Sequence, residues 1–422
     1  MRAGKIIGAM MIIVAAMVMS GCDSNKVYVS PSGNDGGPGS ESRPLRTIGE
    51  AIRRAMPGTT IVLGPGTYVV TEEECMSGAD DGFYVKAFVL TTDGTEDKPI
   101  TITSGSAEAR PVIDLSEIKP AGRRVSGFWM DGDYWVLRGF DIVGIQVTIE
   151  GHTQAENITI DDASHCVIER VNMHDGMGIG VYAKSGHDNL VLNCDAYNNY
   201  DSVSENGKGG NSDGFGFHFN RGSGSSGNVI RGCRAWCNSD DGIDLINNYY
   251  AVTVDNCWTF WNGYDKEMNR RADGTGIKGG GYGLKVKEPF DVPRNIIRNC
   301  IAWANKNKGI YANHHLGGNT WENNMAMGNS HNFHMVNQKS FSENVDVPGY
   351  GHTLTGNISY KGRSGDVVML DMERSLLSGN RFEVGTSLCD TDFVSLDGRE
   401  LLRPRKSDGS LPDIDFMKLR NR

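Results

Sequence analysis

This sequence of 422 residues has little proline and no excess of positive charge, and it has no long apolar run after its N-terminal segment. It has 13 prolines and a formal net charge of −10, from 42 Lys and Arg against 52 Asp and Glu. This acidic balance argues against a nucleic-acid or anionic-membrane surface, since both need clustered basic residues, and it favours cation binding. The 55 glycines follow no Gly-X-Y period, which excludes collagen. Glycine without proline is typical of tight turns in an ordered, strand-rich chain.

The N-terminus has the layout of an export signal. Arg2 and Lys5 precede an apolar run at residues 6–19, which is short for a membrane span. Small residues then precede Cys22, and this ending resembles the bacterial lipobox, in which the cysteine is lipidated. We therefore expect residues 1–21 to be a lipoprotein signal peptide. The exported protein would be tethered through Cys22 to the outer membrane, on its periplasmic or outer face; a plain signal peptide with an incidental cysteine is the alternative.

The remaining cysteines give little sign of disulfides or of zinc. Five of them occupy the same place in recurring segments: Cys166, Cys194, Cys233, Cys257 and Cys300. We expect these to stack as small buried side chains, as free cysteines often do. A CxxC pair with a matching second pair or a His cluster, as a zinc site needs, is missing from the sequence.

Those recurring segments predict the architecture. Each holds a short alternating strand, a turn with Asn or Gly, a second short strand and an Asn-rich end; clear copies are residues 189–199, 228–238, 251–262 and 295–305. Units of this kind cannot bury a face alone and must stack. The simplest stack is an all-β fold, a right-handed parallel β-helix, over residues 22–390. A leucine-rich repeat lacks support because its Leu-x-x-Leu-x-Leu signature is missing, and propeller blades need longer units.

The two ends of the solenoid differ from its repeats. Residues 45–55 have an amphipathic helical pattern, and a short helix there would cap the open N-terminal end, which otherwise exposes unpaired strand edges. Residues 391–422 lose the repeat and include Arg-Pro-Arg-Lys at 403–406. We interpret this region as a C-terminal cap or a loose tail.

Four aspartates form the densest chemistry of the sequence. Asp213 lies in Asn-Ser-Asp-Gly-Phe, and Asp240, Asp241 and Asp244 lie in Asn-Ser-Asp-Asp-Gly-Ile-Asp. On a β-helix the two segments would occupy the same turn of adjacent coils, about 4.8 Å apart. Carboxylates that close disfavour one another's ionised form, and a hard cation relieves this, so oxygen ligands alone predict Ca²⁺. Plain Asp-Gly turns, or a structural Ca²⁺, are the alternatives.

Lysines follow the aspartates in glycine-rich segments. Lys278 lies in Gly-Ile-Lys-Gly-Gly, and Lys285 and Lys287 lie in Gly-Leu-Lys-Val-Lys. Positive charge beside a lysine lowers its pKa, which allows the amine to act as a base. In a uronate polymer the C5 hydrogen lies α to a carboxylate. A cation on that carboxylate and a neutral lysine would together permit β-elimination of the C4 glycosidic oxygen. A solvated pair of lysines on a strand is the alternative.

At these residues the sequence resembles the family-9 polysaccharide lyases, right-handed β-helix enzymes that cleave pectic polymers by β-elimination. The resemblance extends from about Val27 through the last repeats and is most specific at the two aspartate segments. It implies a Ca²⁺ cofactor held by Asp213, Asp240, Asp241 and Asp244.

The resemblance also implies a lysine base in a glycine-rich context before a Val-x-Arg-Asn type strand. Lys285 fits best because such a strand begins near Asn295, and Lys278 has a similar context further from it. The implied partner is an anionic pectic polysaccharide, with rhamnogalacturonan favoured over polygalacturonate. We expect a monomer that contacts the membrane only through its N-terminal anchor and does not bind nucleic acid.

Two other functions share this fold. Pectin hydrolases need Gly-His-Gly and Arg-x-Lys after the aspartates, and only Gly351-His352-Thr353 resembles the first. They also need a protonated carboxyl group as general acid, which a Ca²⁺ cluster opposes. A surface glycan-binding protein would use a platform of rings, for which the candidates are Tyr249, Tyr250, Trp258, Trp261, His314 and His315.

Overall fold

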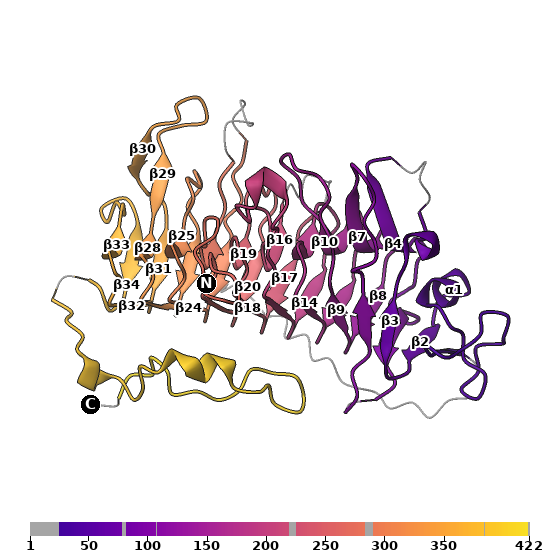
Figure 1. Cartoon of the computed structure of the whole chain (residues 1–422). Helices are drawn as coiled ribbons and strands as arrows, with labels where there is room; N and C mark the ends of the chain where they lie inside the picture. Colours follow the sequence, from indigo (N-terminus) through magenta and orange to yellow (C-terminus); the bar gives the residue numbers. More distant parts are fainter. Residues whose placement is uncertain are drawn as a thin grey trace, which may run out of the picture.

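The chain forms a solenoid of three long parallel β-sheets, as the computed structural model shows over residues 25–77, 82–106, 108–218, 225–282, 290–383 and 385–420. The coils stack along one axis from the N-terminal to the C-terminal end (Figure 1). Each coil passes in turn through a strand of sheet 1, sheet 2 and sheet 3, and each strand pairs in parallel with its equivalents in the neighbouring coils. The predicted right-handed parallel β-helix is confirmed.

The sheets contain twelve, ten and ten strands. Sheet 1 comprises β1 (Lys26–Val29), β2 (Thr60–Leu63), β5 (Ile100–Ser104), β8 (Trp135–Arg138), β11 (Val167–Glu169), β14 (Leu190–Leu192), β17 (Val229–Arg231), β20 (Thr253–Asp255), β23 (Ile296–Arg298), β26 (Thr320–Glu322), β31 (Thr353–Thr355) and β34 (Leu376–Ser378). Sheet 2 comprises β3 (Thr67–Val69), β6 (Val112–Asp114), β9 (Asp141–Val143), β12 (Asn172–His174), β15 (Asp195–Tyr197), β18 (Arg234–Trp236), β21 (Trp258–Phe260), β24 (Ile301–Trp303), β27 (Met325–Met327) and β32 (Ile358–Tyr360). Sheet 3 comprises β4 (Tyr84–Leu90), β7 (Arg124–Met130), β10 (Glu156–Ile160), β13 (Ile179–Ala183), β16 (Phe215–Phe217), β19 (Ile243–Asp244), β22 (Ile277–Lys278), β25 (Lys308–Tyr311), β28 (His331–His334) and β33 (Gly365–Val368).

The interior is a stack of apolar side chains, one layer per coil. On sheet 1 the middle residue of each strand points inward, so Leu137, Ile168, Val191, Ile230 and Val254 are all buried and lie in one register row. Alternation within three-residue strands puts the flanking residues outside. The recurring cysteines join this core as predicted: each is a buried free thiol.

Asparagines form a hydrogen-bonded ladder at the turn from sheet 2 into sheet 3. The side-chain amide of Asn199 donates to Asn238 at 3.0 Å, Asn238 to Asn262 at 3.1 Å, Asn262 to Asn305 at 3.0 Å, and Asn305 to Asn329 at 3.0 Å. All five residues are buried, and their amides also donate to backbone carbonyl groups of neighbouring coils. The ladder therefore satisfies turn groups that would otherwise be buried without partners.

The short helix α1 (Ile48–Arg53) covers the N-terminal end, beside β1 and β4 (Figure 1). Thr47 begins it, and the Thr47 hydroxyl accepts a hydrogen bond from the Glu50 amide at 3.3 Å. Further 3-10 turns are η1 (Glu72–Glu74), η2 (Ser204–Asn206) and η4 (Asp390–Asp392).

Within the described residues, the helices are all too short or too polar to cross a membrane. The predicted leader at 1–21 and the anchor Cys22 lie outside the described residues and stay predictions.

The C-terminal segment, residues 390–420, folds back along the outer face of sheet 2 and not across the end of the solenoid (Figure 1). It includes the 3-10 helix η5 (Gly398–Leu402). Its apolar residues Phe393, Leu401 and Phe416 form a second buried cluster with Trp258 and Phe260 of β21. The segment thus seals an apolar sheet face that would otherwise be exposed to water.

We predict that Asn305→Ala destabilises the fold strongly. The change removes two donated hydrogen bonds and leaves the backbone and side-chain N–H groups of Asn262 without their Asn305 acceptor. Unsatisfied buried groups of this kind cost about 3 kcal/mol in total. Urea unfolding should show this loss, whereas Asn344→Ala, at an exposed loop position, should leave the midpoint almost unchanged. Equal midpoints for the two variants would contradict a structural role for the ladder.

Candidate active site

The four predicted aspartates converge at the edge of sheet 3. Phe215 of β16 pairs with Ile243 of β19, so Asp213 and Asp241, each two residues earlier, occupy the same position of adjacent coils. The Asp241 amide donates to an Asp213 carboxylate oxygen at 3.0 Å. The glycine after each aspartate is a steric requirement, because a Cβ at Gly242 would lie 2.6 Å from the Gly276 carbonyl oxygen.

Two overlapping groups of oxygen and nitrogen ligands arise from this arrangement. Asp213, Asp240 and Asp241 each offer a carboxylate oxygen within 4.8 Å of the others, and so do Asp213, Asp244 and the ring of His218. Asp213, Asp241 and Asp244 are almost fully buried. Asp213 belongs to both groups, so the four aspartates lie close to one another, and their role in metal binding stays a prediction.

Burial and mutual repulsion make this cluster electrostatically unfavourable. Burial, reinforced by the charges of Asp240, Asp244 and Asp241, raises the pKa of Asp213 well above its usual value. Burial likewise raises the pKa of Asp241 to about 7, although Lys278 opposes the shift. These carboxyl groups ionise readily only when a positive charge lies beside them. Their oxygen atoms are the ligands that a hard divalent cation such as Ca²⁺ prefers.

Lys278 lies directly against the aspartates. It ends β22, whose register pairs it with Asp244, and its Nζ is 2.9 Å from an Asp244 carboxylate oxygen. Its Nζ also contacts Asp241. Burial favours the neutral amine, but the surrounding aspartates outweigh burial and raise the pKa of Lys278 well above its usual value. Lys285, which sequence reasoning favoured as the base, and Lys287 both lie outside the described residues, so that prediction stays untested.

His218 was not singled out from the sequence. It follows β16 and is buried, with its Nε2 3.6 Å from an Asp244 oxygen and its ring 5.2 Å from that of Tyr182. Burial lowers the pKa of His218. The only sequence signal is its position: His218 comes directly after the short strand that follows Asp213.

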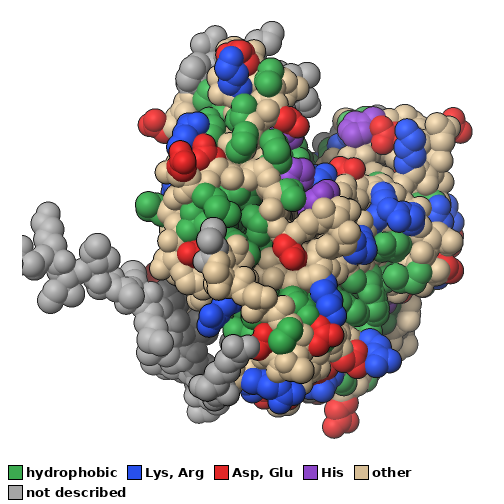
Figure 2. All heavy atoms as spheres, turned by 90° about the vertical axis from the view of Figure 1, so that its left-hand side faces the viewer, with side chains coloured by type: hydrophobic (Ala, Val, Ile, Leu, Met, Phe, Trp, Pro, Cys, Tyr) green, Lys and Arg blue, Asp and Glu red, His purple; other side chains and the backbone are tan. Residues whose placement is uncertain are grey.

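Basic and aromatic side chains continue the site toward the C-terminal end. Tyr311 and His334 follow Lys278 in register on β25 and β28, and Lys308 Nζ lies 4.6 Å from the centre of the Tyr311 ring. Beyond them the hairpin of β29 (Val336–Gln338) and β30 (Asp346–Pro348) projects from the solenoid. Figure 2, viewed toward the C-terminal end, shows a hollow between two projections with histidines near its base. This is an open groove suited to a polymer.

The rings proposed as a sugar platform are mostly structural. His315 is fully buried, and its Nε2 lies 2.7 Å from the Pro293 carbonyl oxygen. Trp258 is buried beneath the C-terminal segment. His314 is partly exposed and pairs with Asp346 at 2.9 Å, at the base of the hairpin. Of these three rings, only His314 is therefore accessible to a sugar.

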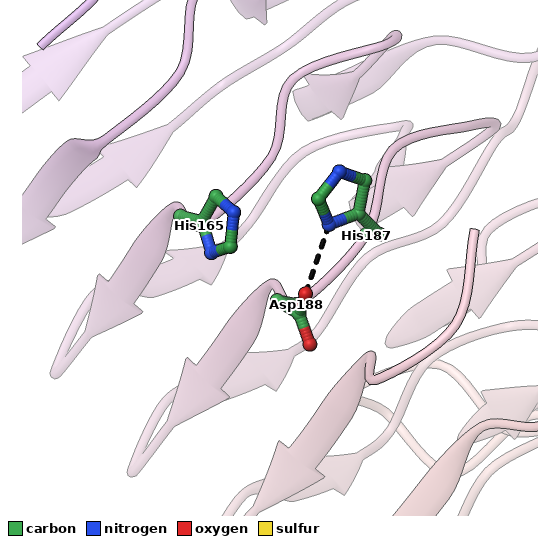
Figure 3. Close-up of side chains that lie close together, drawn as sticks. All are labelled: His165, His187 and Asp188. Atoms are coloured by element: carbon green, nitrogen blue, oxygen red, sulfur yellow. Dashed lines mark hydrogen bonds and ion pairs between the residues drawn. The ribbon is translucent and has the colours of Figure 1, made fainter. Parts of the chain in front are cut away.

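Another group of potential ligands lies at the turns from sheet 3 into sheet 1. His165 precedes β11, and His187 and Asp188 precede β14; the Nδ1 of His187 is 2.9 Å from an Asp188 oxygen (Figure 3). Two imidazoles and one carboxylate suit a transition metal better than Ca²⁺. A hard cation would therefore select the aspartate cluster.

The chain matches the family described as "Pel9A-like, right handed beta helix region" over residues 27–352. The chain belongs to this family. It is a family-9 polysaccharide lyase, as the resemblance predicted. The enzyme is 31% identical to "Pectate lyase L" of Dickeya chrysanthemi, over 95% of this chain and 85% of that protein, and 27% identical to "Pectate lyase PEL9" of Emericella nidulans, over 93% and 91%.

Solved structures agree with these sequence relatives. A "Rhamnogalacturonan lyase" superposes with a TM-score of 0.88 at 41% identity, over 94% of this chain and 96% of that chain. Pectate lyase Pel9A superposes with a TM-score of 0.72 at 28% identity, over 94% and 89%.

Sheet 3 also holds a buried carboxyl group, on the N-terminal side of the aspartates. Glu156 of β10 is fully buried and accepts hydrogen bonds from Gln154 at 2.7 Å and from the Tyr84 hydroxyl at 3.2 Å. Burial raises the pKa of Glu156 to about 7. Since this lies above the unfolded-state value near 4.5, the carboxyl group is a source of instability at neutral pH.

We predict that Glu156→Gln changes how stability depends on pH. In the wild type, stability should fall as pH rises from about 4.5 to about 7, because the folded state holds the proton that the unfolded state has lost. Glutamine cannot ionise, so the variant should gain up to about 3 kcal/mol relative to wild type across this range. Unfolding midpoints at several pH values would measure it. A constant difference between the two proteins would contradict the raised pKa.

Proposed function

We propose that this lyase cleaves the rhamnogalacturonan backbone of pectin by Ca²⁺-dependent β-elimination, with polygalacturonate as the second candidate substrate. The proposal rests on one observation above all: four aspartates and the amine of Lys278 share one largely buried site at the edge of sheet 3. The higher identity to a rhamnogalacturonan lyase, 41% against 31% or less for the pectate lyases, favours the first substrate.

Asp213, Asp240, Asp241 and Asp244 would hold the Ca²⁺. Backbone N–H groups orient all four carboxylates. The Asn211 and Asp273 amides donate to Asp240 at 2.9 and 3.1 Å, and the Thr275 amide donates to Asp241 at 2.6 Å. The Asp241 amide donates to Asp213 at 3.0 Å and the Ile246 amide to Asp244 at 2.8 Å. When bound, Ca²⁺ would neutralise these carboxylates and withdraw charge from a substrate carboxylate. The carboxylates are thus pre-positioned by the backbone.

Lys278 is the residue that we assign as the base, with Lys285 as the alternative. A base must approach the C5 hydrogen beside the substrate carboxylate, and Lys278 is the lysine that the described structure places at the aspartates. Without a cation the aspartates favour the charged form of this amine. Ca²⁺ on the aspartates would cancel that effect, and the neutral amine would then take the C5 proton. The electron pair left on C5 forms the C4–C5 double bond, and the C4 glycosidic oxygen departs with the next sugar. Tyr311 and His334, next in register, are placed to contact the sugars on the C-terminal side.

We predict that Lys278→Ala lowers kcat by about 10²- to 10⁴-fold, the usual contribution of a general base. The assay is the absorbance of the unsaturated uronate product, with the chain starting after Cys22 and with rhamnogalacturonan and polygalacturonate tested side by side. Lys285→Ala is the matched control and should retain activity. The reverse pattern would assign the base to Lys285. Reducing ends without the unsaturated product would contradict elimination by either residue.

We predict that Ca²⁺ raises the thermal unfolding midpoint of the wild type and that a chelator reverses the shift. A ligand that binds only the folded state stabilises it by about 2.7 kcal/mol at a concentration one hundred times its Kd. Asp240→Asn should abolish most of this shift, because it removes a carboxylate charge at nearly constant volume. Asp346→Asn, at an exposed carboxyl group outside the cluster, is the control. An equal shift in all three proteins would place the Ca²⁺ elsewhere.

A further inference from the structure

A second polar cleft lies away from the aspartates, at the corner where the coils turn from sheet 1 into sheet 2. It encloses about 470 Å³, and a turn of the C-terminal segment forms one wall. In a three-sided coil this corner is opposite sheet 3 and the candidate active site. Its cationic side chains are Arg110, Arg138, Arg170, Arg234, Arg405 and Lys406. The last two belong to the Arg-Pro-Arg-Lys sequence that the lyase chemistry leaves without a role.

Two carboxylates, Asp195 in the cleft and Glu169 beside it, are each shared by two guanidinium groups of the cleft. Asp195 contacts Arg234 and Arg405, with the closest nitrogen–oxygen distance 2.6 Å in both pairs. Glu169 contacts the Nε of Arg138 at 2.7 Å and the Nε of Arg170 at 3.1 Å. These two groups thus leave an excess of two positive charges in a protein whose net charge is −10. This local charge is opposite in sign to the aspartate cluster.

The two outer arginines keep donor capacity for a ligand. The side chains of Arg138 and Arg170 are 41% and 36% exposed, and in both the nitrogen that contacts Glu169 is Nε. The terminal N–H groups of a guanidinium form a planar fork that matches a carboxylate. Lys406 adds an ammonium group from the other wall; it is 44% exposed and pairs at 2.7 Å with the solvent-exposed carboxylate of Asp413, which a ligand carboxylate could replace.

Small neutral polar groups line the rest of the cleft. They supply hydroxyl and amide groups of the kind that bind sugar hydroxyls: Thr103, Ser104, Ser106, Asn172, Asn193 and Ser407. The C-terminal wall is fitted closely, because a Cβ at Gly409 would lie 2.3 Å from the Cδ of Arg170. Buried Arg405 fixes this wall through bonds to the Gly232 and Cys194 carbonyl oxygens, both at 3.0 Å. The cleft is therefore a built feature of the fold.

We propose that this cleft, where Arg138 and Arg170 face Lys406, is a second, non-catalytic binding site for a carboxylate-bearing polysaccharide chain. The choice of ligand rests on the proposed function, whereas the cleft and its charge do not. Guanidinium and ammonium groups would pair with uronate carboxylates, and the hydroxyl and amide groups with sugar hydroxyls. A site on the side opposite the groove would hold one stretch of polymer while another is cleaved.

The test is polymer binding under chelating conditions, in which Ca²⁺ cannot assist the groove and cleavage stops. Polygalacturonate is the probe, in affinity electrophoresis or calorimetry. The double variant Arg138→Gln with Lys406→Gln should bind about tenfold more weakly, through loss of charge-assisted hydrogen bonds. Arg399→Gln with Lys418→Gln is the matched control: both side chains are more than 60% exposed and ion-paired, and the charge change is equal. Lys406→Glu alone repeats the test with little risk to folding.

The outcomes separate this site from the lyase assignment. Weaker polymer binding together with unchanged turnover of a short oligosaccharide supports the second site. Weaker binding in a protein that forms no unsaturated product on any polymer would retain the site and reject the proposed function. Equal binding by the double variant and the control overturns the proposal. Equal affinity for fully methyl-esterified polymer, or a preference for vesicles of anionic phospholipid over polygalacturonate, overturns it as well.

Discussion

The buried asparagine ladder between sheets 2 and 3 is the constraint on which the rest of the structure depends. Each amide spans one coil, accepting from the coil before and donating to the coil after, so a slip of one residue in any coil would leave several buried amides without partners. Asn238 belongs to this ladder and comes directly before Ser239, Asp240 and Asp241. The ladder therefore fixes the position of the turn that carries Asp240 and Asp241.

This rigid support matters because the aspartate cluster itself opposes folding. Four carboxyl groups share a partly buried site, and for Asp213 and Asp241 burial disfavours ionisation. Close backbone approach at Gly214 and Gly242 leaves no room for the turns to relax outward. The site is thus held in an electrostatically unfavourable geometry by hydrogen bonds outside it, and a bound cation or the Lys278 amine relieves the repulsion. The hydrogen bonds of the ladder therefore stabilise a fold that contains an electrostatically unfavourable site.

The sequence predicted the coil, the asparagine ends, the buried cysteines and the four aspartates because each depends on neighbours within one repeat or the next. The lysine was harder to assign. More than thirty residues separate Asp244 from Lys278, and much of this interval lacks the repeat. The register that pairs Lys278 with Asp244 is set by β22 and β19 in three dimensions, whereas local sequence context favoured Lys285. The spacing alone could not show which lysine returns to the aspartates.

The C-terminal segment illustrates the same limit over a longer range. It has no repeat, so sequence periodicity could not place it on a sheet. Its position depends on Arg405 reaching Asp195, a pair 210 residues apart in the sequence. Asp195 is the first residue of β15 and points outward, and at this position the repeat pattern predicts only that the residue is polar. Such a long-range ion pair has no local signature.

Charge placement, rather than net charge, explains how an acidic lyase can act on a polyanion. At physiological ionic strength, exposed charges are screened beyond about 8 Å, so a net charge of −10 spread over a long solenoid does little at a given point. The charged groups close to each binding surface therefore determine whether it attracts a polyanion. On one side the carboxylates of the candidate site would share a bound cation with a uronate. On the opposite corner guanidinium groups outnumber carboxylates around Asp195 and Glu169. Each surface is thereby compatible with carboxylate-bearing sugars, one through a metal ion and the other directly.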